Sequence, residues 1–241
     1  MFHAEGDNSS NVDSLTLRVE NISKIFDSKA GRFVALKKIN FSIKKGEFVS
    51  IVGPSGSGKS TLLNILGALD RPSLGKLFVN NVDIFSLNDT QVARIRNNLI
   101  GFIFQSYNLI NRTTVLKNVE IPGIIAGIDG KERRFRALRL LEMLSIKDKA
   151  NQRPVSLSGG QQQRVAIARS LINNPAIILA DEPTGNLDTR TGKEVFGLLK
   201  LISDKYRRTI ILVTHNPELA KETDRIIQIK DGRIERETWV K

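Results

Sequence analysis

The sequence has 241 residues, with 37 Lys and Arg against 25 Asp and Glu, no cysteine and a net charge of +12. This length suits one α/β domain with an inserted subdomain, and the lack of cysteine excludes disulfides and thiolate metal sites. No apolar run is long enough to span a bilayer, and the start lacks the basic and apolar regions of a signal peptide, so we expect a soluble chain.

The pattern along the chain predicts one domain over residues 14–241, preceded by a polar, disordered lead-in at residues 1–13. Residues 15–52 are rich in strand signals, and a short hairpin follows near residues 77–84. Between residues 176 and 229 strands and helices alternate, which predicts a parallel sheet wrapped by helices.

The middle of the chain is expected to be helical. Residues 114–145 contain an amphipathic helix, with the arginines largely off its apolar face. The apolar face is formed by Phe135, Leu138, Leu141 and Leu144. A charge run of this kind is usually a solvated surface.

A glycine-rich loop follows the apolar run at residues 48–52 and precedes a helix-like segment. Its residues match the phosphate-binding pattern GxxxxGK[ST]: Gly53, Pro54, Ser55, Gly56, Ser57, Gly58, Lys59, Ser60 and Thr61. Successive backbone N–H groups of such a loop converge on phosphate oxygens, and the positive end of the helix dipole adds to their attraction. Lys59 would reach the β- and γ-phosphates and the Ser60 hydroxyl would ligate Mg²⁺, so the loop predicts a nucleoside triphosphate site.

A buried strand that ends in two carboxylates supplies the second half of such a site. The apolar run at residues 176–180 suits a parallel strand covered on both faces, and Asp181 at its carboxyl end would hold Mg²⁺ directly or through water. Neighbouring strand residues point in opposite directions, so Glu182 is free to orient and polarise an attacking water. Pro183 stops the strand.

Residues 157–164 carry another motif, at the start of a predicted helix. Ser158 and Gln161, three residues apart, form a capping box for that helix. A capped helix N-terminus is also an anion site, so the structural and the ligand-binding interpretations hold together.

Residues 157–164 resemble the signature motif of the ATP-binding cassette (ABC) ATPases. In that family the matching Ser158, Gly159, Gly160 and Gln161 face the γ-phosphate bound by the other subunit. The resemblance implies an α/β fold with a P-loop NTPase core and mostly parallel sheet, an antiparallel β subdomain, and an inserted α-helical subdomain at about residues 106–165.

Further family landmarks follow in the expected order. Gln105 resembles the glutamine that senses Mg²⁺ and links the site to the helical subdomain, and His215 matches a histidine that contacts the γ-phosphate and helps hold Glu182. The loop that crosses the dimer interface is matched by Gly185, Asn186, Leu187 and Asp188. The resemblance therefore implies a catalytic set of Lys59, Gln105, Glu182 and His215, and a metal set of Ser60, Gln105 and Asp181.

The family stacks adenine on an aromatic residue of an early strand, often tyrosine, and Phe26 is the residue that this chain offers. A π-face is sufficient for stacking, so phenylalanine can serve, and we expect loose base selectivity. An ordinary core position in an antiparallel strand is the alternative interpretation of Phe26.

The likeness runs from about residue 15 to residue 237 and includes the ATPase subunits of the lipoprotein-releasing, macrolide-export and cell-division group. It implies an ATP-hydrolysing subunit that binds ATP and Mg²⁺, forms a head-to-tail homodimer, and engages an integral, permease-like membrane protein at the cytoplasmic face of the membrane. The loop at residues 107–111 and the helix from near Thr114 would form the groove for that partner. Leu109 and Ile110 are equally consistent with ordinary covered positions.

Two other classes compete with this interpretation. A soluble ABC ATPase that acts on ribosomes or DNA is the alternative, but such relatives usually join two cassettes or carry long insertions; a monomeric P-loop kinase would give Ser158 no role. The net charge is compatible with nucleotide, anionic lipid or nucleic acid. Because aromatic residues make up only 6% of the chain and form no interleaved platform with basic residues, no nucleic-acid partner is expected.

Overall fold

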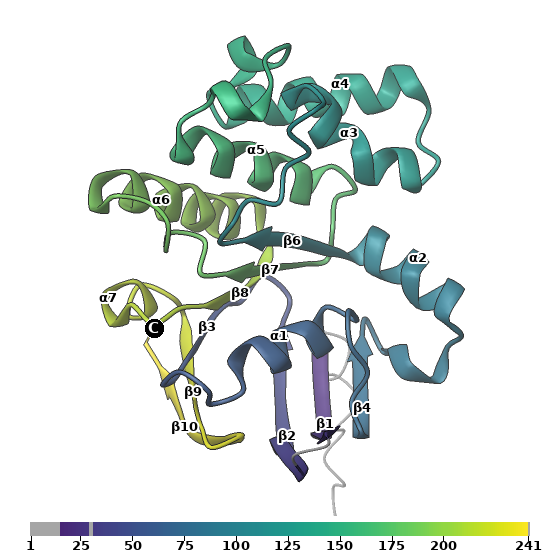
Figure 1. The fold of residues 1–241 in the computed structure, drawn as a ribbon, viewed down its shortest axis with the longest axis vertical. Helices are drawn as coiled ribbons and strands as arrows, with labels where there is room; N and C mark the ends of the chain where they lie inside the picture. The colour runs from purple at the N-terminus through teal and green to yellow at the C-terminus, as the bar shows by residue number, and fades with distance from the viewer. Residues whose placement is uncertain (1–14, 29–30, 241) are drawn as a thin grey trace, which may run out of the picture.

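The computed structural model describes residues 15–28 and 31–240, so the predicted lead-in at residues 1–13 lies outside the described residues. The chain forms two sheets, and helices cover both faces of the larger one (Figure 1). Within the described ranges, no helix is both long enough and apolar enough to cross a bilayer.

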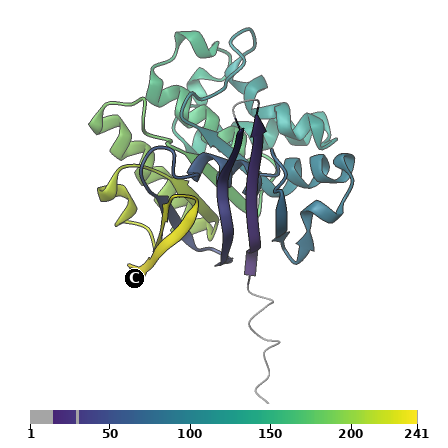
Figure 2. The same ribbon diagram turned by 60° about the horizontal axis from the view of Figure 1, so that its bottom comes forward.

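The smaller sheet is antiparallel, with strand order β2-β1-β4-β5. Its strands are β1 (Leu15–Ser28), β2 (Gly31–Lys44), β4 (Leu74–Val79) and β5 (Val82–Asp83). The predicted strand-rich start and the short hairpin are therefore confirmed, although Ile84 already belongs to a 3₁₀ turn, η1 (Ile84–Ser86). Figure 2 brings β1 and β2 forward as two long neighbouring strands.

The larger sheet has strand order β10-β9-β3-β8-β7-β6. Its strands are β3 (Phe48–Val52), β6 (Ile100–Phe104), β7 (Ile177–Asp181), β8 (Thr209–Val213), β9 (Arg225–Lys230) and β10 (Arg233–Trp239). All pairings are parallel except that of β10 with β9. This confirms the predicted parallel sheet and brings the carboxyl ends of β3, β7 and β8 to one edge.

The α-helices are α1 (Lys59–Leu66), α2 (Asp89–Leu99), α3 (Val115–Ile125), α4 (Gly130–Met143), α5 (Gly159–Leu171), α6 (Thr189–Tyr206) and α7 (Pro217–Ala220). Two 3₁₀ turns, η2 (Lys147–Lys149) and η3 (Pro154–Ser156), connect α4 to α5. In Figure 1, α1 lies on one face of the larger sheet and α5 and α6 on the other.

Alternating residues of the central strands enter two different cores. Ile177 and Leu179 of β7 pack in the cluster that contains α1 and the antiparallel sheet. Ile178 and Ala180 pack in the cluster formed with α3 to α6. Because successive strand residues point to opposite faces, a strand that is apolar at every position is buried on both sides.

The amphipathic helix predicted within residues 114–145 is present as α4, but the apolar face assigned to it is wrong at Phe135. The structure has two helices there, α3 and α4, with Asp129 capping the second. The buried stripe of α4 consists of Ala137 and Leu141 and continues to Leu144, while the side chain of Phe135 is 55% exposed. A helical period of 3.6 residues places Phe135 roughly opposite Ala137, which explains its exposure.

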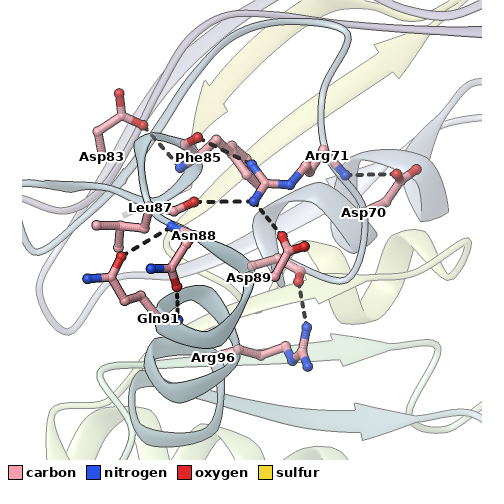
Figure 3. A network of polar contacts seen from close by, with 10 residues as sticks. Asp70, Arg71, Asp83, Phe85, Leu87, Asn88, Asp89, Gln91 and Arg96 are labelled. Carbon is pink, nitrogen blue, oxygen red and sulfur yellow. Dashed lines mark hydrogen bonds and ion pairs between the residues drawn. The ribbon is translucent and has the colours of Figure 1, made fainter.

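Helix α2 is tied to the segment that follows α1 by a polar network (Figure 3). The Arg71 guanidinium donates to the Phe85 and Leu87 carbonyl oxygens and pairs with Asp89 at 2.8 Å. Arg96 donates to the Ala68 carbonyl oxygen at 2.9 Å. The network fixes α2 beside the end of α1, where it forms one wall of a cavity described below.

Candidate nucleotide site

The glycine-rich loop connects β3 to α1 at the carboxyl edge of the larger sheet. No side chain caps α1, and its first turn carries no acidic residue, so its first N–H groups are available to an anion. The Lys59 ammonium donates to the carbonyl oxygens of Gly53 and Pro54, both at 2.8 Å. Lys59 is therefore held against the carbonyl oxygens of its own loop, at the N-terminus of α1.

Two glycines of the loop cannot be replaced without moving the backbone. A Cβ on Gly53 would lie 2.1 Å from the Ile229 carbonyl oxygen, and one on Gly58 would lie 2.7 Å from the Ala35 carbonyl oxygen. Gly58 also has a φ of 103°. The loop is therefore packed directly against β2 and β9.

Asp181 ends β7 beside this loop and is partly buried. Burial raises the pKa of its carboxyl group, the charge of Glu182 raises it further, and the charge of Lys59 opposes both. The charges of Lys59 and Glu182 therefore both act on the Asp181 carboxyl group.

Glu182 lies just beyond the strand, and not within it as the alternation argument assumed. Its φ is 44°, in the left-handed region, and its N–H donates to the Val213 carbonyl oxygen at 2.9 Å. The turn brings Glu182 Oε1 to 2.8 Å from His215 Nδ1. A left-handed glutamate is uncommon, and such backbone positions are concentrated at functional sites.

Gln105 follows β6 at the same edge of the sheet. Its side-chain amide donates to Asn186 Oδ1 at 3.3 Å, and the Asn186 amide donates back to the Gln105 carbonyl oxygen at 3.0 Å. A Cβ on Gly185 would lie 2.6 Å from Gln105 Nε2, so a larger residue there would displace the Gln105 side chain. Two landmarks that are far apart in the sequence therefore form one hydrogen-bonded unit.

Ser158 and Gln161 form the predicted capping box at the start of α5. Gly160 is buried against α6, and a Cβ there would lie 2.3 Å from Thr191 Cγ2. Among the residues described, no hydrogen bond or ion pair joins residues 158–161 to the glycine-rich loop. The structure therefore does not bring the signature residues of one chain to that chain's own phosphate loop.

Arg169 of α5 is a residue that sequence reasoning missed. Its guanidinium donates to the carbonyl oxygens of Tyr107 at 2.8 Å and Asn108 at 2.5 Å, both of which have left-handed φ values. Burial lowers the pKa of Arg169. Helix α5, which begins at the signature residues, therefore holds the loop after Gln105 and links two parts of the site. No local sequence pattern points to this contact.

The aromatic residues near the phosphate loop also differ from expectation. Phe26 lies in β1 and is 42% exposed, so the alternative of a core position is wrong. Phe33 pairs with Phe26 across the β1–β2 ladder and lines the hollow formed by Ser55, Gly58 and Lys59. Directly paired residues of an antiparallel ladder share one face. The structure therefore adds Phe33 to Phe26 as a second aromatic residue that could stack on the base. This pairing depends on the register of the β1–β2 hairpin, which no local sequence pattern indicates.

A protein-family comparison matches residues 36–185 of this chain to the family described as ABC transporter. The chain belongs to that family. It is an ATP-binding subunit of the ABC type, with the ATPase activity of these cassettes, and the fold and the order of motifs agree with the resemblance seen in the sequence.

Curated relatives support the assignment. An ABC transporter ATP-binding protein of Thermotoga maritima is 50% identical over 219 residues, which cover 91% of this chain and 93% of the relative. The ATP-binding protein MJ0796 of Methanocaldococcus jannaschii is 49% identical over 92% of this chain and 96% of the relative. The macrolide export ATP-binding/permease protein MacB of Bartonella henselae is 50% identical over 90% of this chain and 33% of its own length.

Solved structures show the same fold. A dimeric structure of MJ0796 in a post-hydrolysis state with ADP and Pi has a TM-score of 0.86 and 47% identity, and the match covers 93% of this chain and 99% of that one. The cbiO1 structure from Clostridium perfringens, part of the cbiONQ transporter complex, has a TM-score of 0.83 and 30% identity over 94% of this chain and 89% of that one.

Proposed function

We propose that two copies of this cassette close head to tail around two ATP molecules and transmit the closure to a membrane partner. The observation that carries the proposal is the separation of two ATP-binding elements within one chain. Ser158 and Gly160 make no polar contact with the glycine-rich loop among the described residues, and we infer that they act on the ATP bound by a second copy. The dimeric MJ0796 structures are consistent with this arrangement.

The loop and the end of β7 would hold the triphosphate and Mg²⁺. Ser60, Gln105 and Asp181 offer a hydroxyl, an amide and a carboxylate, which are the hard oxygen ligands that Mg²⁺ accepts together with phosphate oxygens and water. The first N–H groups of α1, which no side chain caps, would bind the phosphate chain. Bound Mg²⁺ would neutralise phosphate charge.

Glu182 is the residue best placed to orient and polarise the attacking water. Its backbone turn and the contact with His215 at 2.8 Å hold the carboxylate in one position. His215 is 74% exposed, so its ring is accessible to the γ-phosphate. Lys59 would add positive charge to the phosphate oxygens, where negative charge develops during hydrolysis.

The surface for a membrane partner is proposed between α2 and α3. A cavity of about 430 Å³ lies there, lined by residues that include Asn97, Phe104, Asn108 and Ile125. Ile125 is 69% exposed and Ile110, nearby in the loop predicted to bind the partner, is 48% exposed, whereas Leu109 packs against the core. A cassette that binds its membrane partner through this groove would lie at the cytoplasmic face of the membrane.

Mixing two inactive variants tests the composite site. Ser158→Arg removes the contribution of α5, and Lys59→Ala removes that of the phosphate loop, so each variant alone should hydrolyse little ATP. In an equal mixture about half of the dimers contain both variants and hold one intact site of two, so about a quarter of the activity should return. A mixture with no more activity than its components, although mixed dimers form, would contradict the proposal.

A further inference from the structure

A polar cavity of about 440 Å³ lies at the edge of the larger sheet opposite the nucleotide site. Its lining includes Lys45, Leu99, Ala176 and Arg208, which precede β3, β6, β7 and β8 respectively. Parallel strands that begin together also end together, and the glycine-rich loop follows the far end of β3. This cavity, called the basic pocket here, is therefore separate from the ATP site.

The lining of the basic pocket is positively charged. It includes Lys45, Arg207 and Arg208, together with the amide side chains Asn80, Asn81 and Asn174. No Asp or Glu lines it among residues 15–28 and 31–240. Three cations and three amides without a carboxylate form a surface suited to an anion with several charges.

The cations of the basic pocket are available to a ligand. Lys45 and Arg207 are exposed, and neither forms an ion pair within the described part of the chain. Arg208 is partly buried, and its guanidinium donates to the Pro175 carbonyl oxygen at 3.4 Å and to the Asn174 side chain. Those bonds orient Arg208 without neutralising it, since both acceptors are uncharged.

The walls of the basic pocket are held by the fold. Arg207 ends α6 with a left-handed φ of 51°, and Gly46 next to Lys45 donates its N–H to Thr209 Oγ1 at 3.0 Å. The Asn80 N–H donates to the Thr16 carbonyl oxygen at 3.0 Å, which fixes the β4–β5 turn. A hollow formed by pinned turns presents its charges with little loss of chain entropy on binding.

We propose that the basic pocket binds a free, multiply charged phosphate compound, such as a polyphosphate or a phosphorylated metabolite, independently of ATP. Arginine is suited to phosphate because its fork of donors matches two phosphate oxygens. The volume of about 440 Å³ lies in the range of small-molecule sites. This assignment also gives a function to part of the net charge of +12, which the nucleotide site alone does not use.

The test is a calorimetric titration with inorganic tripolyphosphate while saturating ADP occupies the glycine-rich loop. The variant Lys45→Gln/Arg207→Asn removes two charges from the pocket, and asparagine accepts the left-handed backbone at residue 207. The matched control Lys131→Gln/Arg134→Gln removes two exposed charges from α4. Saturable binding to the parent, at least ten-fold weaker in the pocket variant and within two-fold of the parent in the control, is expected.

Absence of saturable binding with ADP present, or an equal loss in the control variant, would overturn the proposal. Sedimentation with vesicles of anionic phospholipid separates a free ligand from a lipid headgroup. If vesicle binding depends on Lys45 and Arg207 and tripolyphosphate does not bind, these cations serve a membrane surface. That result would overturn the proposal of a site for a free phosphate compound. ATPase activity of the pocket variant equal to that of the parent checks that the fold and the separate ATP site are intact.

Discussion

His215 Nδ1 lies 2.8 Å from Glu182 Oε1, although the two residues are 33 positions apart in the sequence. The contact joins the ends of the adjacent strands β7 and β8. Glu182 reaches it only because its backbone turns out of the strand into a left-handed conformation with a φ of 44°. This relationship fixes the carboxylate at the edge of the sheet where the triphosphate is expected.

Replacing Glu182 by glutamine should separate ATP binding from hydrolysis. The amide keeps the size of the side chain but cannot polarise water as a carboxylate does, so the hydrolysis rate should fall by about 10²- to 10⁴-fold with ATP affinity retained. Steady-state ATPase assays and nucleotide titration measure the two effects, and ATP should trap the variant as a dimer. Glu142→Gln, an exposed change on α4, is the control. Hydrolysis by Glu182→Gln at the parental rate would exclude the role given to this residue.

Phe33→Ala should weaken ATP binding about ten-fold, because an aromatic face that stacks on a base contributes roughly 1–3 kcal/mol. Phe26→Ala tests the residue predicted from the sequence in the same way. Inorganic tripolyphosphate, which has no base, should bind the phosphate loop equally well with and without each aromatic change, measured in the Lys45→Gln/Arg207→Asn background that weakens the basic pocket. Phe135→Ala removes an equally exposed ring on α4 and should change nothing. If Phe33→Ala and the parent bind ATP equally well, the ring does not contact the base.

Gly160→Ala should destabilise the chain, because the new methyl group would lie 2.3 Å from Thr191 Cγ2. Overpacking of this kind costs about 1–3 kcal/mol in the free energy of unfolding, measured by urea denaturation. Adding Thr191→Ser removes the opposing methyl group and should restore most of the loss. Gly197→Ala, where nothing lies within 4 Å, should stabilise α6 by about 1 kcal/mol. A double variant as unstable as Gly160→Ala would show that the α5–α6 contact is not the cause.

Asp181→Asn should raise stability near neutral pH while it reduces hydrolysis. Burial raises the pKa of Asp181 in the folded state above its ordinary value of 3.8, so the folded chain holds this proton more tightly than the unfolded chain. The carboxyl group therefore stabilises the folded state most below pH 3.8. That contribution is lost as the pH rises through the folded-state pKa. The gain from asparagine should be largest above that pKa and should shrink toward pH 3.8. Urea denaturation across this pH range measures the gain in the free energy of unfolding. A gain that does not change with pH would show that the raised pKa of Asp181 is not its cause.

The predicted site rests largely on local sequence patterns. The residues from Gly53 to Thr61 are contiguous, and a loop of this kind needs only its own backbone and the following helix to form an anion site. The capping box of Ser158 and Gln161 spans three positions and is present as predicted. The alternation of strands and helices was sufficient for the parallel sheet, whose register places Asp181 beside Val213.

Other features depend on contacts between distant segments. The pairing of Gln105 with Asn186 and the hydrogen bonds from Arg169 to the loop after Gln105 each need two segments that meet only in the fold. The position of Phe33 depends on the register of the β1–β2 hairpin. None of these is encoded in a spacing along the chain.

By itself, the sequence determined the parallel sheet and predicted the phosphate loop through periodic burial and a local motif, and its motifs carried the resemblance that implied the rest of the fold class. Only the tertiary structure decided which side chains share a site, which signature residues stand apart from their own phosphate loop, and where uncompensated charge gathers into the basic pocket. The physical reason is that packing and electrostatic interactions act through space, while a sequence specifies neighbours only along the chain.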